Sequence, residues 1–293
     1  MERNVPITRA IALAALACSL VSSAPAFAQG FGAPIMDIAG HWATRQHEDQ
    51  EERGPGGELG DYTGLPLNDA ARLRADTWSA ALYGLDEWQC RPHTSPNIWR
   101  SVYPATITKD IDHVTGEAIA YHINFQNLID RVIWLDGRPH PSEDAPHTWA
   151  GFSTGKWEGD MLTITTTHIK EYILRRDGVP HSDQATMIEH LLRHGDFLTI
   201  VQIVTDPVYL TEPYIQSTDF QLDLHGTEAP VLCEVEEETD HPRGWVPHRS
   251  PEQAQKDQET FAKKHNLPIE AVKGGAETIY PEYRKKLKQL GVQ

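Results

Sequence analysis

From about residue 104 to residue 235, hydrophobic and polar residues alternate with a period of two, in short runs separated by tight turns such as Gly159-Asp160 and Gly195-Asp196. The candidate strands are 104–110, 117–126, 129–135, 148–157, 161–169, 185–194, 197–205, 213–222 and 230–237. The links between them are too short for the crossovers of a doubly wound parallel sheet. The pattern predicts a mainly β fold, an antiparallel meander that closes into a barrel or folds as a sandwich.

Helical patterns lie on either side of this region. Asn68 precedes a run with apolar residues at helical spacing, which predicts an N-capped helix that leads into the barrel domain. Residues 251–264 and 277–289 predict two C-terminal helices that pack outside the sheet. We therefore expect four regions: 1–28, 29–66, 67–246 and 247–293.

The first two regions carry no packed element in this prediction. Arg3 and Arg9 precede an apolar run at 10–21 and a small-residue stretch ending at Ala28, which is the layout of a cleaved secretory signal. Residues 29–66 are rich in Gly, Pro and acidic residues and predict an extended surface arm. The signal predicts a periplasmic or secreted protein, and the apolar run is too short to span a bilayer, so we expect no membrane association after cleavage.

Cys90 and Cys233 remain after cleavage of the signal. A disulfide between them would persist in an oxidising compartment, and two separate buried thiols are the alternative. The spacing fits neither a zinc finger nor a thioredoxin-type motif.

Charge and missing motifs exclude several classes of function. The formal net charge is -16, which repels phosphate backbones and anionic membrane surfaces, so we expect no nucleic-acid partner. Phosphate-binding glycine loops and dinucleotide fingerprints are absent, and we expect no cofactor. A small-molecule substrate is the expected partner, and the sequence does not decide between a monomer and a homodimer.

Residue parity along the strands points to a ligand cavity. Alternate residues of a strand share one face, so in 161–168 the even-numbered face holds His168 together with Leu162 and Ile164. In 186–194 the even-numbered face holds His190 together with aliphatic residues. A barrel lumen with a partly polar cavity would produce such mixtures, while half-exposed strand residues or core histidines are the alternative. Arg138, Trp134 and Trp149 are further candidates for substrate binding, although core packing also accounts for the tryptophans.

Acid–base chemistry requires a group that takes a proton and another that gives one. The candidates for these roles are His140, His181, Asp183, Glu189 and Tyr121. His181 and Asp183 are two residues apart, so a carboxylate could orient the imidazole.

Several short motifs resemble those of a large family of secreted, mostly uncharacterised bacterial proteins. They are Asp-Gly-Arg-Pro-His-Pro at 136–141, Gly-Lys-Trp-Glu-Gly-Asp at 155–160, Pro-His-Ser-Asp at 180–183, the stretch 60–68, and Asp206-Pro207 followed by Tyr209 and Pro213. The similarity covers about residues 38–237. The resemblance implies a lipocalin-like barrel and, more loosely, an activity like that of periplasmic lyases acting on lignin-derived aromatic dimers such as phenylcoumarans. The family pattern often has Glu-Arg at 189–190, where this chain has Glu-His, so only Glu189 carries over.

Three hypotheses follow. The first is a cofactor-independent lyase that holds a plant-derived aromatic molecule in the barrel lumen, with His181 or Glu189 as the base and a Tyr or His as the acid. The second is a lipocalin-like binding protein without catalysis. The third is a metal-dependent hydrolase of glycosides or esters, for which the pair His190 and His194 and the acidic run from His47 are weak signals, and we expect no metal.

Overall fold

The computed structural model describes residues 37–45, 56–126, 129–227, 233–236, 242 and 244–291. The chain divides into two compact units, Met1–Asp37 and Ile38–Gln293, and all elements below belong to the second. The predicted signal at 1–28 and the acidic run at 47–49 lie outside the described residues, as do parts of the predicted arm and of the predicted strand 230–237.

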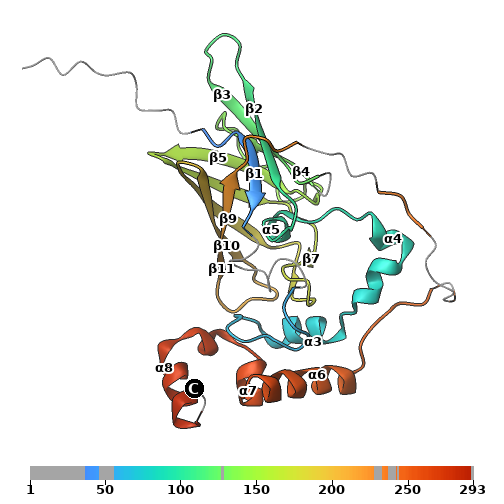
Figure 1. Ribbon diagram of the computed structural model, residues 1–293. Helices are drawn as coiled ribbons and strands as arrows, with labels where there is room; N and C mark the ends of the chain where they lie inside the picture. The colour runs from blue at the N-terminus through green and yellow to red at the C-terminus, as the bar shows by residue number, and fades with distance from the viewer. Residues whose placement is uncertain are drawn as a thin grey trace, which may run out of the picture. The chain divides into compact units, whose positions relative to one another are not determined.

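Nine strands form a closed barrel in the order β1-β11-β10-β9-β6-β5-β4-β3-β2 (Figure 1). Their bounds are β1 Gly40–Thr44, β2 Ala105–Ile111, β3 Ala118–Asn124, β4 Asp130–Trp134, β5 Phe152–Glu158, β6 Met161–Thr167, β9 Thr186–His194, β10 Phe197–Thr205 and β11 Tyr214–Leu222. This confirms the predicted barrel and removes the sandwich alternative. Eight of the strands match predicted ones, but residues 233–236 of the predicted strand 230–237 are not in a strand. The remaining strand of the barrel is β1, which lies in the region predicted to be an extended surface arm.

One strand pair departs from an antiparallel meander. β4 and β5 are parallel, with Ile133 opposite Ser153 and Trp134 opposite Thr154, whereas the other barrel pairs are antiparallel. The long link over residues 135–151 allows the chain to return to the end of the barrel at which β4 began. The prediction of a wholly antiparallel sheet is wrong at this pair, because the link between these two strands is long enough for a crossover that leaves them parallel.

The barrel interior is a packed core. Trp99, which follows the short helix α5 (Ser95–Ile98), makes edge-on contacts with Phe125 and Phe220, with ring centroids 5.3 Å and 5.7 Å away. Trp42 of β1 is fully buried in the same cluster. Burying these rings together excludes water from most of the lumen and stabilises the barrel.

Apart from α5, whose four residues are buried, the helices lie outside the barrel, as predicted. They are α3 Asp69–Thr77, α4 Asp86–Gln89, α6 Pro251–Lys264, α7 Ile269–Val272 and α8 Pro281–Gln289, with 3-10 turns η2 Ala80–Gly84 and η3 Ala276–Ile279. The Asn68 side chain accepts a hydrogen bond from the Ala71 amide, which confirms the predicted cap of α3. Among the described residues, no helix is long and apolar enough to cross a membrane.

Asp76 of α3 joins three parts of the chain. It accepts hydrogen bonds from the Tyr62 hydroxyl at 2.8 Å and from the Gln258 amide of α6 at 2.9 Å. Tyr62 is fully buried, so this part of the predicted surface arm packs into the fold.

Cys90 and Cys233 form a disulfide with an S–S distance of 2.10 Å. The bond ties the segment at 233–236 to α4, where the Gln89 side chain also donates to the Glu236 carbonyl at 2.6 Å. The alternative of two free thiols is excluded, and a disulfide favours an oxidising compartment.

Candidate functional site

Glu189 lies at the centre of a buried polar network inside the barrel. Glu189 and Arg131 form an ion pair with side chains 0% and 1% exposed, and Arg131 Nη1 donates to Glu189 Oε1 at 2.8 Å. The Trp99 indole donates to the same carboxylate at 2.5 Å. Arg131 also donates to the hydroxyls of Ser153 and Thr166, at 3.0 Å and 2.6 Å. Each charged group is thus saturated by protein partners, which is typical of a structural network.

The odd-numbered residues of β9 point inward. Met187, Glu189 and Leu191 are buried, whereas His190 is on the outer face, where its Nδ1 lies 3.1 Å from the Thr163 hydroxyl. The parity prediction that placed His190 on the inner face is therefore wrong. Tyr121 does face inward, but it is 2% exposed and packs in the aromatic and aliphatic core.

His181 is fully buried in the short hairpin of β7 (Tyr172–Ile173) and β8 (Pro180–His181). Its Nδ1 donates to the Ser182 carbonyl at 3.1 Å, so Nε2 accepts from the Thr94 hydroxyl at 2.9 Å. Burial lowers the pKa of His181 to about 4, and the nearby Asp206 opposes this shift. The imidazole is therefore neutral and fully bonded at neutral pH.

Asp183 does not orient His181. Its side chain is exposed, whereas Asp206 is buried and accepts from the Ser182 amide and hydroxyl at 2.6 Å and 2.8 Å. The carboxylate that supports this hairpin lies 25 residues from His181 along the chain, so spacing in the sequence did not indicate it.

His140 and His168 lie together on the outside of β5 and β6. His140 contacts the hydroxyls of Thr154 and Thr167 at 2.9 Å and 2.8 Å, and His168 contacts Thr167 at 2.7 Å. His168 has a φ of 58°, which ends the strand and turns its side chain away from the lumen, so its predicted inward position is wrong. Burial, and then the charge of His168, lower the pKa of His140.

The exposed Arg138 guanidinium lies 3.5 Å from the ring centroid of Trp134, which is half-buried. Arg138 also pairs with Asp136 at 2.6 Å. Trp149 lies elsewhere, 5.9 Å from the ring of Tyr172. The structure therefore does not bring the predicted catalytic and substrate-binding residues together in one cavity.

An aromatic pocket lies outside the barrel and is lined by residues in or beside α3, α4 and β7 and by residues 246–248. Its volume is about 440 Å³, and we define it by Arg74, Trp78, Trp88, Arg91 and Tyr172. The rings of Trp88 and Tyr172 stack with centroids 6.1 Å apart. The Arg91 guanidinium lies 3.8 Å above Trp88.

Local sequence explains how this pocket forms. Gly178 has a φ of 95°, and a Cβ there would lie 2.4 Å from Trp78, so the turn after β7 needs glycine for the indole to pack against it. Trp78, Tyr83 and Trp88 recur every five residues in a region without strand alternation. Such spacing is the one sequence signal that could have indicated the pocket.

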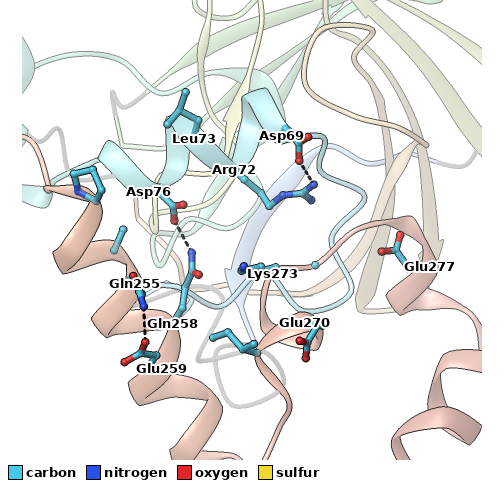
Figure 2. Close-up of a pocket in the computed structure, with 14 residues that line it drawn as sticks. Asp69, Arg72, Leu73, Asp76, Gln255, Gln258, Glu259, Glu270, Lys273 and Glu277 are labelled. Carbon is cyan, nitrogen blue, oxygen red and sulfur yellow. Dashed lines mark hydrogen bonds and ion pairs between the residues drawn. The ribbon is translucent and has the colours of Figure 1, made fainter.

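A larger crevice of about 940 Å³ separates α3 from α6 and α7. Figure 2 shows that its polar side chains bond one another, including Arg72 with Asp69 and Gln255 with Glu259. No aromatic residue lines it, and five of its lining residues are acidic. We interpret it as a polar seam between packed helices.

Within the part of the chain that the structure describes, no group of three or more His, Cys, Asp or Glu side chains is arranged to hold a metal ion. Comparison with known proteins gives no further identification: no protein-family model, no curated protein and no solved structure matches this chain. The family resemblance drawn from the motifs stays a prediction.

Proposed function

We propose that this chain binds a small aromatic compound with an anionic group in the aromatic pocket. The observation that carries this proposal is the convergence of three aromatic side chains and two guanidinium groups, from α3, α4 and β7 and their flanking residues, on one cavity of about 440 Å³. Cavities of roughly 300–1,000 Å³ are typical of small-molecule sites. The proposal follows the binding-protein hypothesis, but it moves the ligand from the lumen to the outside of the barrel.

The walls offer complementary chemistry for such a ligand. Trp88 and Tyr172 line the pocket with apolar ring atoms, against which an aromatic ligand can pack. Burial raises the pKa of Tyr172 well above its ordinary value of 10, so its phenol stays neutral. Apolar walls with a few polar groups fix the orientation of a ligand without a high desolvation cost.

Arg91 supplies the selectivity for an anion. Its guanidinium lies over Trp88 at 3.8 Å and over Trp149 at 5.5 Å, and it makes no ion pair with any described residue. Arg74 is paired with Glu171 at 3.3 Å. The chain has a formal charge of -16, so the Arg91 guanidinium offers a carboxylate ligand a local positive partner on an otherwise acidic protein.

Two features support an inference about the compartment. The layout of residues 1–28 is that of a secretory signal, and the disulfide between Cys90 and Cys233 is stable under oxidising conditions. We infer a periplasmic or secreted location, in which a binding protein would meet plant-derived aromatic acids.

A lyase acting in the same pocket is the second candidate. Glu171 and His248 both line the pocket, so a carboxylate and an imidazole face one bound molecule. These two residues, rather than His181 and Glu189, are the acid–base pair that this candidate requires.

Calorimetric titration with aromatic acids and their methyl esters tests the proposal. We expect Arg91→Ala to weaken binding of the acid at least tenfold and binding of the ester much less. Arg138→Ala is the matched control, because Arg138 also stacks on a tryptophan, at 3.5 Å, and neither residue lines the pocket. Equal affinity of wild type and Arg91→Ala for the acid would overturn the proposal. Mass spectrometry of the same mixtures separates the two candidates: a new product that disappears in Glu171→Gln supports the lyase.

A further inference from the structure

The outer face of four adjacent strands, β6, β9, β10 and β11, is almost free of charge. Along these strands the outward side chains alternate with buried ones, and all of them belong to the described residues. Among the outward side chains of these strands, Asp219 is the one carboxylate, there is no Lys or Arg, and Thr199 donates to Asp219 at 2.5 Å. Charged groups of neighbouring segments contact the face at its edges, where Arg45 lies 4.9 Å from the Phe197 ring and Glu158 accepts from the Thr163 hydroxyl at 2.9 Å. We call this surface the uncharged face.

The register of the strands gathers apolar side chains into rows on this face. Ile203 of β10 is paired with Ile188 of β9 on one side and with Ile215 of β11 on the other. In the adjacent rows, Val201 lies beside His190, and Leu192 lies beside Met161. Cross-strand neighbours of this kind form a continuous surface.

Two of these aliphatic side chains are exposed to solvent, and Ile203 and Val201 between them are half-buried. Ile188 is 41% exposed and Ile215 is 65% exposed. The alternation of the strands is fully explained by the buried inner face, so fold stability does not require isoleucine at the outward positions. Exposed apolar patches larger than a few hundred Å² mark interaction surfaces.

We propose that the uncharged face is the contact surface between two copies of this chain. With a formal charge of -16, two copies repel each other, and the electrostatic cost is lowest where the surface carries the fewest charges. β10 lies between its two neighbours near the middle of the face, so a two-fold axis near Val201 places the isoleucine row of each copy on the face of the other.

The size of the face sets the strength of this dimer. Three strands of nine residues and one of seven, about 4.8 Å apart and with a rise of about 3.3 Å per residue, cover about 540 Å². A standard interface buries about 800 Å² on each partner. We therefore expect a dimer that forms reversibly in the micromolar range, and we expect added salt to strengthen it because salt screens the repulsion between the copies.

Sedimentation velocity of the full chain from about 1 to 500 µM, at low and high salt, tests the proposal. Wild type should shift from monomer to dimer with concentration, at lower concentrations in high salt. The double variant Ile188→Glu with Ile215→Glu should stay monomeric, whereas the control Ile119→Glu, at a 37% exposed position on β3, should behave as wild type. Far-UV circular dichroism confirms that each variant is folded. A wild type that stays monomeric throughout, or a folded double variant that dimerises as wild type does, would overturn the proposal.

Discussion

Removing the charge of Glu189 should strongly destabilise the fold, because it leaves Arg131 buried without a counter-ion. Both side chains are at most 1% exposed, and Glu189 accepts from Arg131 and from the Trp99 indole. Breaking a buried ion pair by removing one partner costs about 3–5 kcal/mol. We expect Glu189→Gln to lower the free energy of unfolding by that amount, measured by urea denaturation followed by tryptophan fluorescence and circular dichroism.

Removing both charges should cost much less. In the double variant Glu189→Leu with Arg131→Met, the hydroxyls of Ser153 and Thr166 still bond each other at 3.0 Å, and the Trp99 indole alone loses its acceptor. An unsatisfied donor costs about 1–3 kcal/mol, so the double variant should be more stable than Glu189→Gln. The structural role of Glu189 would be refuted if the free energy of unfolding of Glu189→Gln were within 1 kcal/mol of the wild-type value. It would also be refuted if the double variant were less stable than Glu189→Gln.

Two further predictions concern pH and the disulfide. Burial holds the pKa of His181 at about 4, whereas the unfolded chain takes up a proton near pH 6.5, so the free energy of unfolding should fall by about 3 kcal/mol as the pH drops from 6.5 towards 4. In His181→Gln, urea denaturation at several pH values should not show this loss. Identical pH profiles in the wild type and the variant would contradict the prediction. Replacing Cys90 and Cys233 by serine should lower the free energy of unfolding by at most about 5 kcal/mol, since the bond closes a loop with a sequence separation of 143. It should also weaken binding in the aromatic pocket, because the bond anchors α4, and a variant with unchanged melting temperature and affinity would count against this reasoning.

Much of the fold could be predicted because it depends on local patterns. Period-two alternation indicated eight barrel strands, and Asn68 and the periodic run after it indicated α3. β1 could not be predicted in the same way: it has five residues in a Gly-rich and polar region, and it becomes a strand by pairing with β2 and β11. Such pairing is a non-local contact that carries no local signal.

The candidate site was harder to predict, because the alternation of residues along a strand does not say which face of the strand points into the barrel. The inner face of β9 holds Glu189, whose partner Arg131 lies 58 residues earlier, and no sequence feature marks this pair. The histidines were favoured because their chemistry is versatile, yet His140, His168 and His190 contact threonine hydroxyls outside the barrel. The aromatic pocket is assembled from residues near 78, 88, 172 and 247, which only the tertiary fold brings together.

Hydrogen–deuterium exchange with and without a saturating aromatic acid tests the central claim most directly, since it locates the ligand on the chain. A ligand in the aromatic pocket should slow exchange at 74–91, 171–178 and 246–248, the segments that line it. The barrel strands β3 and β9 should exchange at the same rate in both samples. Protection confined to β3 and β9 would place the ligand in the lumen and contradict the account.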